Sequence, residues 1–69
     1  MTYQENENYI AEYISGLLFI TSKRDGRETA TGLRNERGQC ITRGQFTSSV
    51  ESGGFNRACE TFMKLGVAV

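Results

Sequence analysis

The sequence contains no histidine, and this is its most informative chemical feature. Histidine is the usual general base near neutral pH, and a nucleophilic serine or cysteine normally needs such a neighbour. The two cysteines, Cys40 and Cys59, therefore have no imidazole partner, and two thiols alone cannot complete a tetrahedral metal site. We expect both cysteines to be reduced and buried as small apolar side chains, with no metal bound.

Acid–base and phosphate chemistry find equally little support. The eight acidic residues are scattered among basic and polar neighbours, as on a solvated surface. The segment Ser52-Gly53-Gly54-Phe55 would offer backbone N–H groups to an anion, but it lacks the GxxxxGK[ST] pattern of a phosphate-binding loop. The sequence thus predicts a protein that is not an enzyme and uses no cofactor.

Charge is unevenly distributed although the net charge is zero. Residues 1–22 carry three acidic and no basic side chains, whereas residues 23–43 carry six basic and three acidic ones. The basic residues are the candidate partner-binding set: Lys23, Arg24, Arg27, Arg34, Arg37 and Arg43. They suit an acidic protein surface or nucleic-acid phosphates. The alternative is a solvated hairpin with cross-strand charge pairs.

Length and composition predict one small globular domain covering residues 1–69. A chain of this size buries only about 60% of its unfolded surface, so its stability is marginal. Met1 is followed by polar residues without a basic start or an early apolar run, so no secretory signal is recognised. The longest apolar stretch is far shorter than the roughly 20 residues needed to span a bilayer. These features predict a cytoplasmic protein.

The first element is expected to be a short helix over residues 6–15. An apolar residue recurs at helical spacing in Ile10, Tyr13, Ile14, Leu17 and Leu18. Asn6 or Asn8 would cap the start, and Gly16 would end the helix. The competing interpretation is a strand that begins near Tyr9, since tyrosine and isoleucine also favour sheets.

The clearest local signal is Asp25-Gly26, which suits a two-residue type I′ turn between strands over residues 19–24 and 27–31. A second turn is expected near Asn35–Gly38, followed by a third strand over residues 39–46. The last element is a helix from Phe55, preceded by a capping box over Ser48–Glu51 and ended by a Schellman motif at Gly66.

Together these elements predict an α+β fold. A three-stranded antiparallel sheet would carry the N-terminal and C-terminal helices on one face. Tyr9 and Tyr13 are candidates for partner contact or self-association, because tyrosine is enriched at interfaces and a dimer would bury more apolar area than this small chain can alone. Packing in the monomer core is the alternative for both.

In length, in its lack of catalytic residues and in the hairpin-then-helix layout around Arg24-Asp25-Gly26-Arg27, the chain resembles the small accessory proteins of phages and mobile elements. These include anti-CRISPR and other anti-defence inhibitors. The resemblance implies a stoichiometric inhibitor of a host enzyme or nucleoprotein complex, and it assigns no site residues.

The leading hypothesis is a non-catalytic regulator or inhibitor that docks on a larger host protein complex through charge and shape. The alternative is a small nucleic-acid-binding regulator that uses the basic hairpin, although no aromatic residue between Ile20 and Gln45 is present to stack a base. A small-molecule or redox domain built on Cys40 and Cys59 ranks last.

Overall fold

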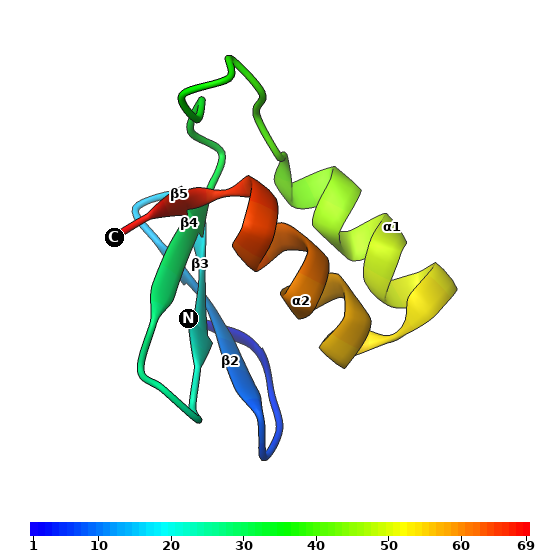
Figure 1. Cartoon of the computed structure of the whole chain (residues 1–69). Coiled ribbons are helices and arrows are strands. Elements are labelled where there is room, and N and C mark those ends of the chain that lie inside the picture. Colours follow the sequence, from blue (N-terminus) through cyan, green and yellow to red (C-terminus); the bar gives the residue numbers. More distant parts are fainter.

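A computed structural model describes all residues, 1–69, and has the α+β architecture that the sequence predicts, with more strands than expected. Five antiparallel strands pair in chain order, and two helices lie on one side of the sheet (Figure 1). In chain order the elements are β1 (Thr2–Glu5), β2 (Tyr9–Ile14), β3 (Leu17–Ser22), β4 (Glu28–Thr31), α1 (Arg43–Gly53), α2 (Phe55–Leu65) and β5 (Val67–Ala68).

The N-terminal helix over residues 6–15 was a wrong prediction. The segment is strand β2, as in the competing interpretation that began a strand near Tyr9. Ser15 and Gly16 both have positive φ angles, 52° and 82°, and they join Ile14 directly to its partner Leu17. This is the backbone of a two-residue primed hairpin turn. The apolar residues of this segment satisfy both helical and alternating spacing. Because the turn pairs β2 with β3, the segment forms a strand and not a helix.

The hairpin at Asp25-Gly26 is confirmed, but its turn is longer than a two-residue turn. Ser22 donates its N–H to the carbonyl of Arg27, and Gly26 donates its N–H to the carbonyl of Ser22. Four residues, 23–26, therefore lie between the hydrogen-bonded residues Ser22 and Arg27. Gly26 has φ 74°, and the Asp25 carboxylate accepts a hydrogen bond from the backbone of Arg27 at 3.1 Å.

The third strand predicted over residues 39–46 was also wrong. Only an isolated bridge between Arg34 and Cys40 forms there, around the turn at Asn35–Gly38 that the sequence did predict. Helix α1 then begins at Arg43 because Thr42 and Gln45 form a reciprocal capping box. The capping box expected at Ser48–Glu51 instead lies inside α1.

The helix predicted from Phe55 is confirmed as α2. Gly54, with φ 90°, separates it from α1, and Gly66 follows its last turn. Gly66 has an extended backbone (φ −77°, ψ −178°) rather than the left-handed conformation of the expected Schellman motif. Gly66 is required for steric reasons, because it joins α2 directly to β5 and lies close against β4. A Cβ atom at this position would lie 2.8 Å from the carbonyl oxygen of Ala30 and 3.0 Å from that of Phe62.

The core lies between the sheet and the two helices. Phe46 is fully buried and is the main anchor of α1, whereas α2 buries one face along most of its length. The sheet contributes the residues of β2 and β3 that point toward the helices. The core cluster comprises Ala11, Leu18, Ile20, Ile41, Phe46, Phe55, Ala58, Cys59 and Phe62. Tyr3, Tyr9 and Tyr13 pack against its edge.

Gly66→Ala is expected to destabilise the protein by about 1–3 kcal/mol, because the added methyl group has no room against β4. Gly44→Ala is the matched control, since a Cβ there would meet only the Thr42 hydroxyl at 3.9 Å. Alanine within a helix is favoured over glycine, so the control should be neutral or stabilising. Urea unfolding of both variants tests this expectation, and equal stabilities for the two would contradict it.

Candidate functional site

The six basic residues of the candidate binding set do not form one continuous surface. Lys23, Arg24 and Arg27 lie at the β3–β4 turn, whereas Arg34 and Arg37 lie in the loop between β4 and α1. These two segments are at opposite ends of the sheet (Figure 1). Strand β3 separates them by about 17 Å, given its six residues and a rise of roughly 3.3 Å per residue. The hairpin thus carries three of the six basic residues at its tip, and the other three lie outside it.

Four of the six basic side chains also have partners within the fold. Lys23 forms an ion pair with Glu5, and Arg27 forms one with Asp25 at 2.9 Å. Arg34 donates to the carbonyl oxygen of Gly38 at 2.7 Å. The fourth is Arg43, whose guanidinium lies 4.3 Å from the centre of the Tyr13 ring. Hydrogen bonding to the Arg27 backbone, which outweighs desolvation, lowers the pKa of Asp25 and so favours its charged form.

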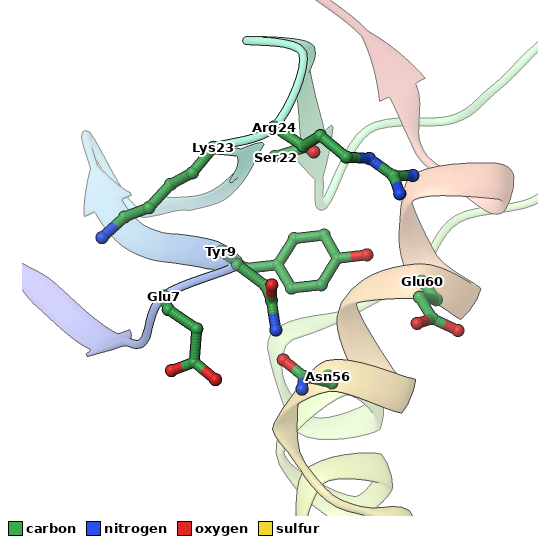
Figure 2. A pocket seen from close by; sticks show the side chains of 8 residues that line it. Glu7, Tyr9, Ser22, Lys23, Arg24, Asn56 and Glu60 are labelled. Atoms are coloured by element: carbon green, nitrogen blue, oxygen red, sulfur yellow. The ribbon is translucent and has the colours of Figure 1, made fainter.

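Tyr9 lies at an open polar cleft of about 350 Å³ between the β1–β2 turn, the end of β3 and helix α2. Figure 2 shows its ring pointing from β2 toward α2, between Arg24 and Glu60. Burial, and then the charge of Glu60, raises the pKa of Tyr9. Small-molecule sites are lined mostly by apolar side chains, whereas Tyr9 is the only hydrophobic residue here. The cleft therefore lacks the apolar lining of a typical ligand pocket.

Tyr13 packs on the helix side of the sheet, as Tyr9 does. Its ring meets that of Tyr3 edge-on, with centroids 5.8 Å apart. The guanidinium of Arg43 lies over the same ring. Its hydroxyl group is buried without a hydrogen-bond partner. The sequence-based alternative of core packing thus describes where both tyrosines lie, and self-association through them stays a prediction.

Cys40 and Cys59 are both free thiols, and they lie in different environments. Cys59 is fully buried in α2, and burial followed by the charge of Glu60 raises its pKa to about 12. Cys40 is partly exposed in the loop before α1. No group of three or more cysteine, aspartate or glutamate side chains is placed to hold a metal ion.

The sheet has a second face that neither helix covers, and the sequence analysis missed it. Alternate residues of each strand point away from the helices, and the cross-strand register brings them into rows. The middle row runs Thr2, Glu12, Phe19, Ala30, Val67, and the row beside it runs Glu5, Ile10, Thr21, Glu28. Ile14 and Leu17 form a further pair beyond the middle row. We call these eleven residues the open face.

Apolar side chains occupy the centre of the open face. Ile14 is 50% exposed, and Ile10, Leu17 and Phe19 are only partly buried. None of these four belongs to the core cluster or packs against it. Apolar side chains gathered on one exposed face of a small protein are a candidate contact site. The signal was present in the sequence, because Ile10, Glu12 and Ile14 alternate with Tyr9, Ala11 and Tyr13.

The only ionisable residues on the open face are acidic. Glu12 lies between Thr2 and Phe19, whereas Glu5 and Glu28 lie at the two ends of their row. Glu5 is paired with Lys23, and Glu28 accepts a weak hydrogen bond from Thr21 at 3.4 Å. Glu12 and Glu28 have no ion-pair partner. Glu12 on β2 and Glu28 on β4 therefore lie on either side of β3, and Glu12 also separates Ile10 from Ile14 along β2.

Comparison of the chain with protein-family models, curated proteins and solved structures gives no match. Neither helix has the length and apolar composition needed to cross a bilayer. The candidate site is thus chosen on the geometry of the structure, and it is the open face.

Tyr13→Phe is expected to stabilise the fold by about 1 kcal/mol, because it removes a buried hydroxyl that has no partner. The aromatic face beneath Arg43 is retained. Tyr3→Phe is the matched control, since the Tyr3 hydroxyl is not buried without a partner, and it should change stability little. Denaturant unfolding at neutral pH measures both variants. A loss of stability in Tyr13→Phe would mean that the hydroxyl is hydrogen-bonded in solution.

The two thiols should differ in reactivity. Iodoacetamide at pH 8 is expected to modify Cys40 in the native protein and Cys59 only after unfolding, as read by mass spectrometry of intact protein and peptides. The raised pKa of Cys59 means that the fold favours the neutral thiol. Its contribution to stability is complete below the ordinary pKa of 9.0 and is lost as the pH rises toward about 12. Rapid native alkylation of Cys59 would contradict its burial.

Proposed function

We propose that this chain is a non-catalytic protein-binding regulator that acts by stoichiometric docking on a larger partner. The single observation that carries the proposal is the open face. Half of the sheet's side chains point away from the helices. Of their apolar members, Ile14 is 50% exposed and Ile10, Leu17 and Phe19 are partly exposed, whereas Ala30 is buried. Covering this surface with another protein would remove apolar area from water, which is the main favourable term in most protein association.

The contact surface proposed here is the open face, whereas the sequence suggested the basic residues. The basic residues were expected to dock on an acidic partner, but four of them are engaged within the fold and the set is divided between two ends of the sheet. Arg24 and Arg37 are the two without a bonded partner, and they lie in these two different segments. A regulator of the anti-defence inhibitor type, which the layout of the chain resembles, would use the open face in the same way.

The docking surface is tested with the double variant Ile10→Thr/Ile14→Thr. Threonine keeps the β-branched shape that favours a strand while removing most of the apolar contact area. Partners captured from a cell lysate are identified by quantitative mass spectrometry, and each is then purified and its complex with the full chain weighed by light scattering. We expect a complex of fixed stoichiometry whose affinity falls at least tenfold in the double variant.

Two controls accompany this experiment. Leu33→Thr alters an apolar residue of similar exposure, 43%, in the loop outside the strands, and it should retain the partner. Arg24→Gln/Arg27→Gln tests the basic turn directly. Loss of the partner in the arginine variant alone would assign docking to the basic residues, and full binding by the isoleucine variant would remove the open face as the site. Circular dichroism and thermal unfolding confirm that each variant is folded.

A further inference from the structure

The open face has a shape and charge that specify its partner more narrowly, and the inference rests on the docking proposed above. We propose that the open face binds a helical segment of another protein whose apolar stripe is flanked by lysine or arginine residues. The interaction is a helix laid across the exposed sheet, with cations of the helix on Glu12 and Glu28.

The dimensions of the open face suit a single helical segment. With strands about 4.8 Å apart and a rise of about 3.3 Å per residue, the five strands present a projected area on the order of 300 Å². A helix about 10 Å wide and 12 residues long covers about 18 Å, which matches the length of β2 and β3.

The preference for a helix follows from how sheets are covered. A sheet buries its apolar face against a helix or another sheet, and in this protein the opposite face is already covered by α1 and α2 (Figure 1). A helix on the open face would complete a three-layer arrangement. The residues that would contact its stripe are the central ones, Ile10, Ile14 and Phe19.

The charges decide between a basic segment and a second copy of this chain. In a twofold-symmetric dimer formed through the open face, each carboxylate would meet residues of the same face. That face offers Glu5, Glu12 and Glu28 and no free cation, since the neighbouring Lys23 is already paired with Glu5. Glu12 and Glu28 would then be desolvated without counter-charges, which is costly. A partner that carries cations on both sides of an apolar stripe supplies these counter-charges.

The same charges disfavour an anionic lipid surface. Anionic headgroups attract clusters of lysine and arginine, whereas the unpaired groups of the open face are the carboxylates of Glu12 and Glu28. A membrane contact through this face would bring charges of the same sign together. Charge complementarity therefore selects a basic, amphipathic polypeptide.

The experiment uses the full chain and three synthetic peptides of about 16 residues, long enough to span the sheet as a helix. The first peptide carries leucines at positions i, i+3, i+4 and i+7 with flanking lysines. The second has glutamate in place of each lysine, and the third has the composition of the first in scrambled order. Fluorescence anisotropy gives the affinities, and NMR of the methyl groups locates the contact.

We expect the lysine-flanked peptide to bind on the order of tenfold more tightly than the glutamate-flanked one at low salt, since two exposed ion pairs, at Glu12 and Glu28, would be replaced by like-charge contacts. The difference should shrink at high salt. Methyl signals of Ile10, Ile14 and Leu17 should shift, whereas those of the core residues Leu18 and Ile20 should shift little. The scrambled peptide should bind weakly because its leucines do not form a stripe.

Two variants make the test specific. Glu12→Gln/Glu28→Gln should abolish the preference for the lysine-flanked peptide while leaving its apolar contact. The matched control Glu51→Gln removes an exposed carboxylate on α1 and should leave the preference unchanged. The isoleucine double variant should lose binding of the lysine-flanked peptide altogether. Methyl shifts confined to residues of the helical layer would overturn the inference.

The remaining outcomes separate this inference from the proposed function. Equal binding of both charged peptides at the open face, or binding of neither while natural partners still depend on Ile10 and Ile14, would overturn the basic-helix partner and leave protein docking intact. Partner binding that ignores both isoleucines would overturn the proposed function itself. The last arm is sedimentation of the chain alone. A dimer that forms with the natural sequence but not with the isoleucine double variant would overturn the basic helix and identify a second copy of this chain as the partner.

Discussion

The structure depends on the burial of one aromatic ring, that of Phe46. This ring meets Tyr3 of β1 at 5.6 Å, Phe55 at 6.3 Å and Phe62 at 5.5 Å between centroids, so it joins the edge of the sheet to both helices. Phe46 is the only fully buried residue of α1, and Val50 of the same helix is partly buried against the core. Aromatic rings bury a large area for a single residue. One side chain thus fixes where the helical layer lies on a chain too short for a large core.

Placing both helices on one face has a direct consequence for the other. A strand sends successive side chains to opposite faces, so every strand that contributes to the core also contributes to the open face. A larger protein would cover both faces, but the two helices of this chain are both used on one. The partly exposed Ile10 and the exposed Ile14 of β2 therefore follow from the same alternation that buries Ala11, and the proposed docking would remove them from water.

The sequence predicted the elements whose signals are local and failed where signals compete. Phe55 and the apolar stripe after it define α2 unambiguously, and Asp25-Gly26 defines a hairpin. The segment from Tyr9 to Leu18 satisfies helical and alternating patterns together, so only pairing with a neighbouring strand decides between them. The strand expected over residues 39–46 failed because the capping pair Thr42 and Gln45 outweighs a weak alternation.

The candidate site was less predictable than the fold for a related reason. Counting charges along the chain groups Lys23 to Arg43 as one basic segment, but folding carries the two halves of that segment to opposite ends of β3. The carboxylates Glu12 and Glu28 are sixteen residues apart in a chain of zero net charge, and only the strand register brings them to one face.

Charge segregation of this kind determines which partners are excluded as much as which are bound. The apolar centre of the open face would by itself accept many amphipathic segments, since hydrophobic contact is non-directional. In the proposed interaction, the unpaired carboxylates on either side of β3 would penalise acidic segments and copies of the same face, because like charges would be buried together. In the proposed interaction, selectivity would therefore depend on Glu12 and Glu28, which contribute nothing to the core.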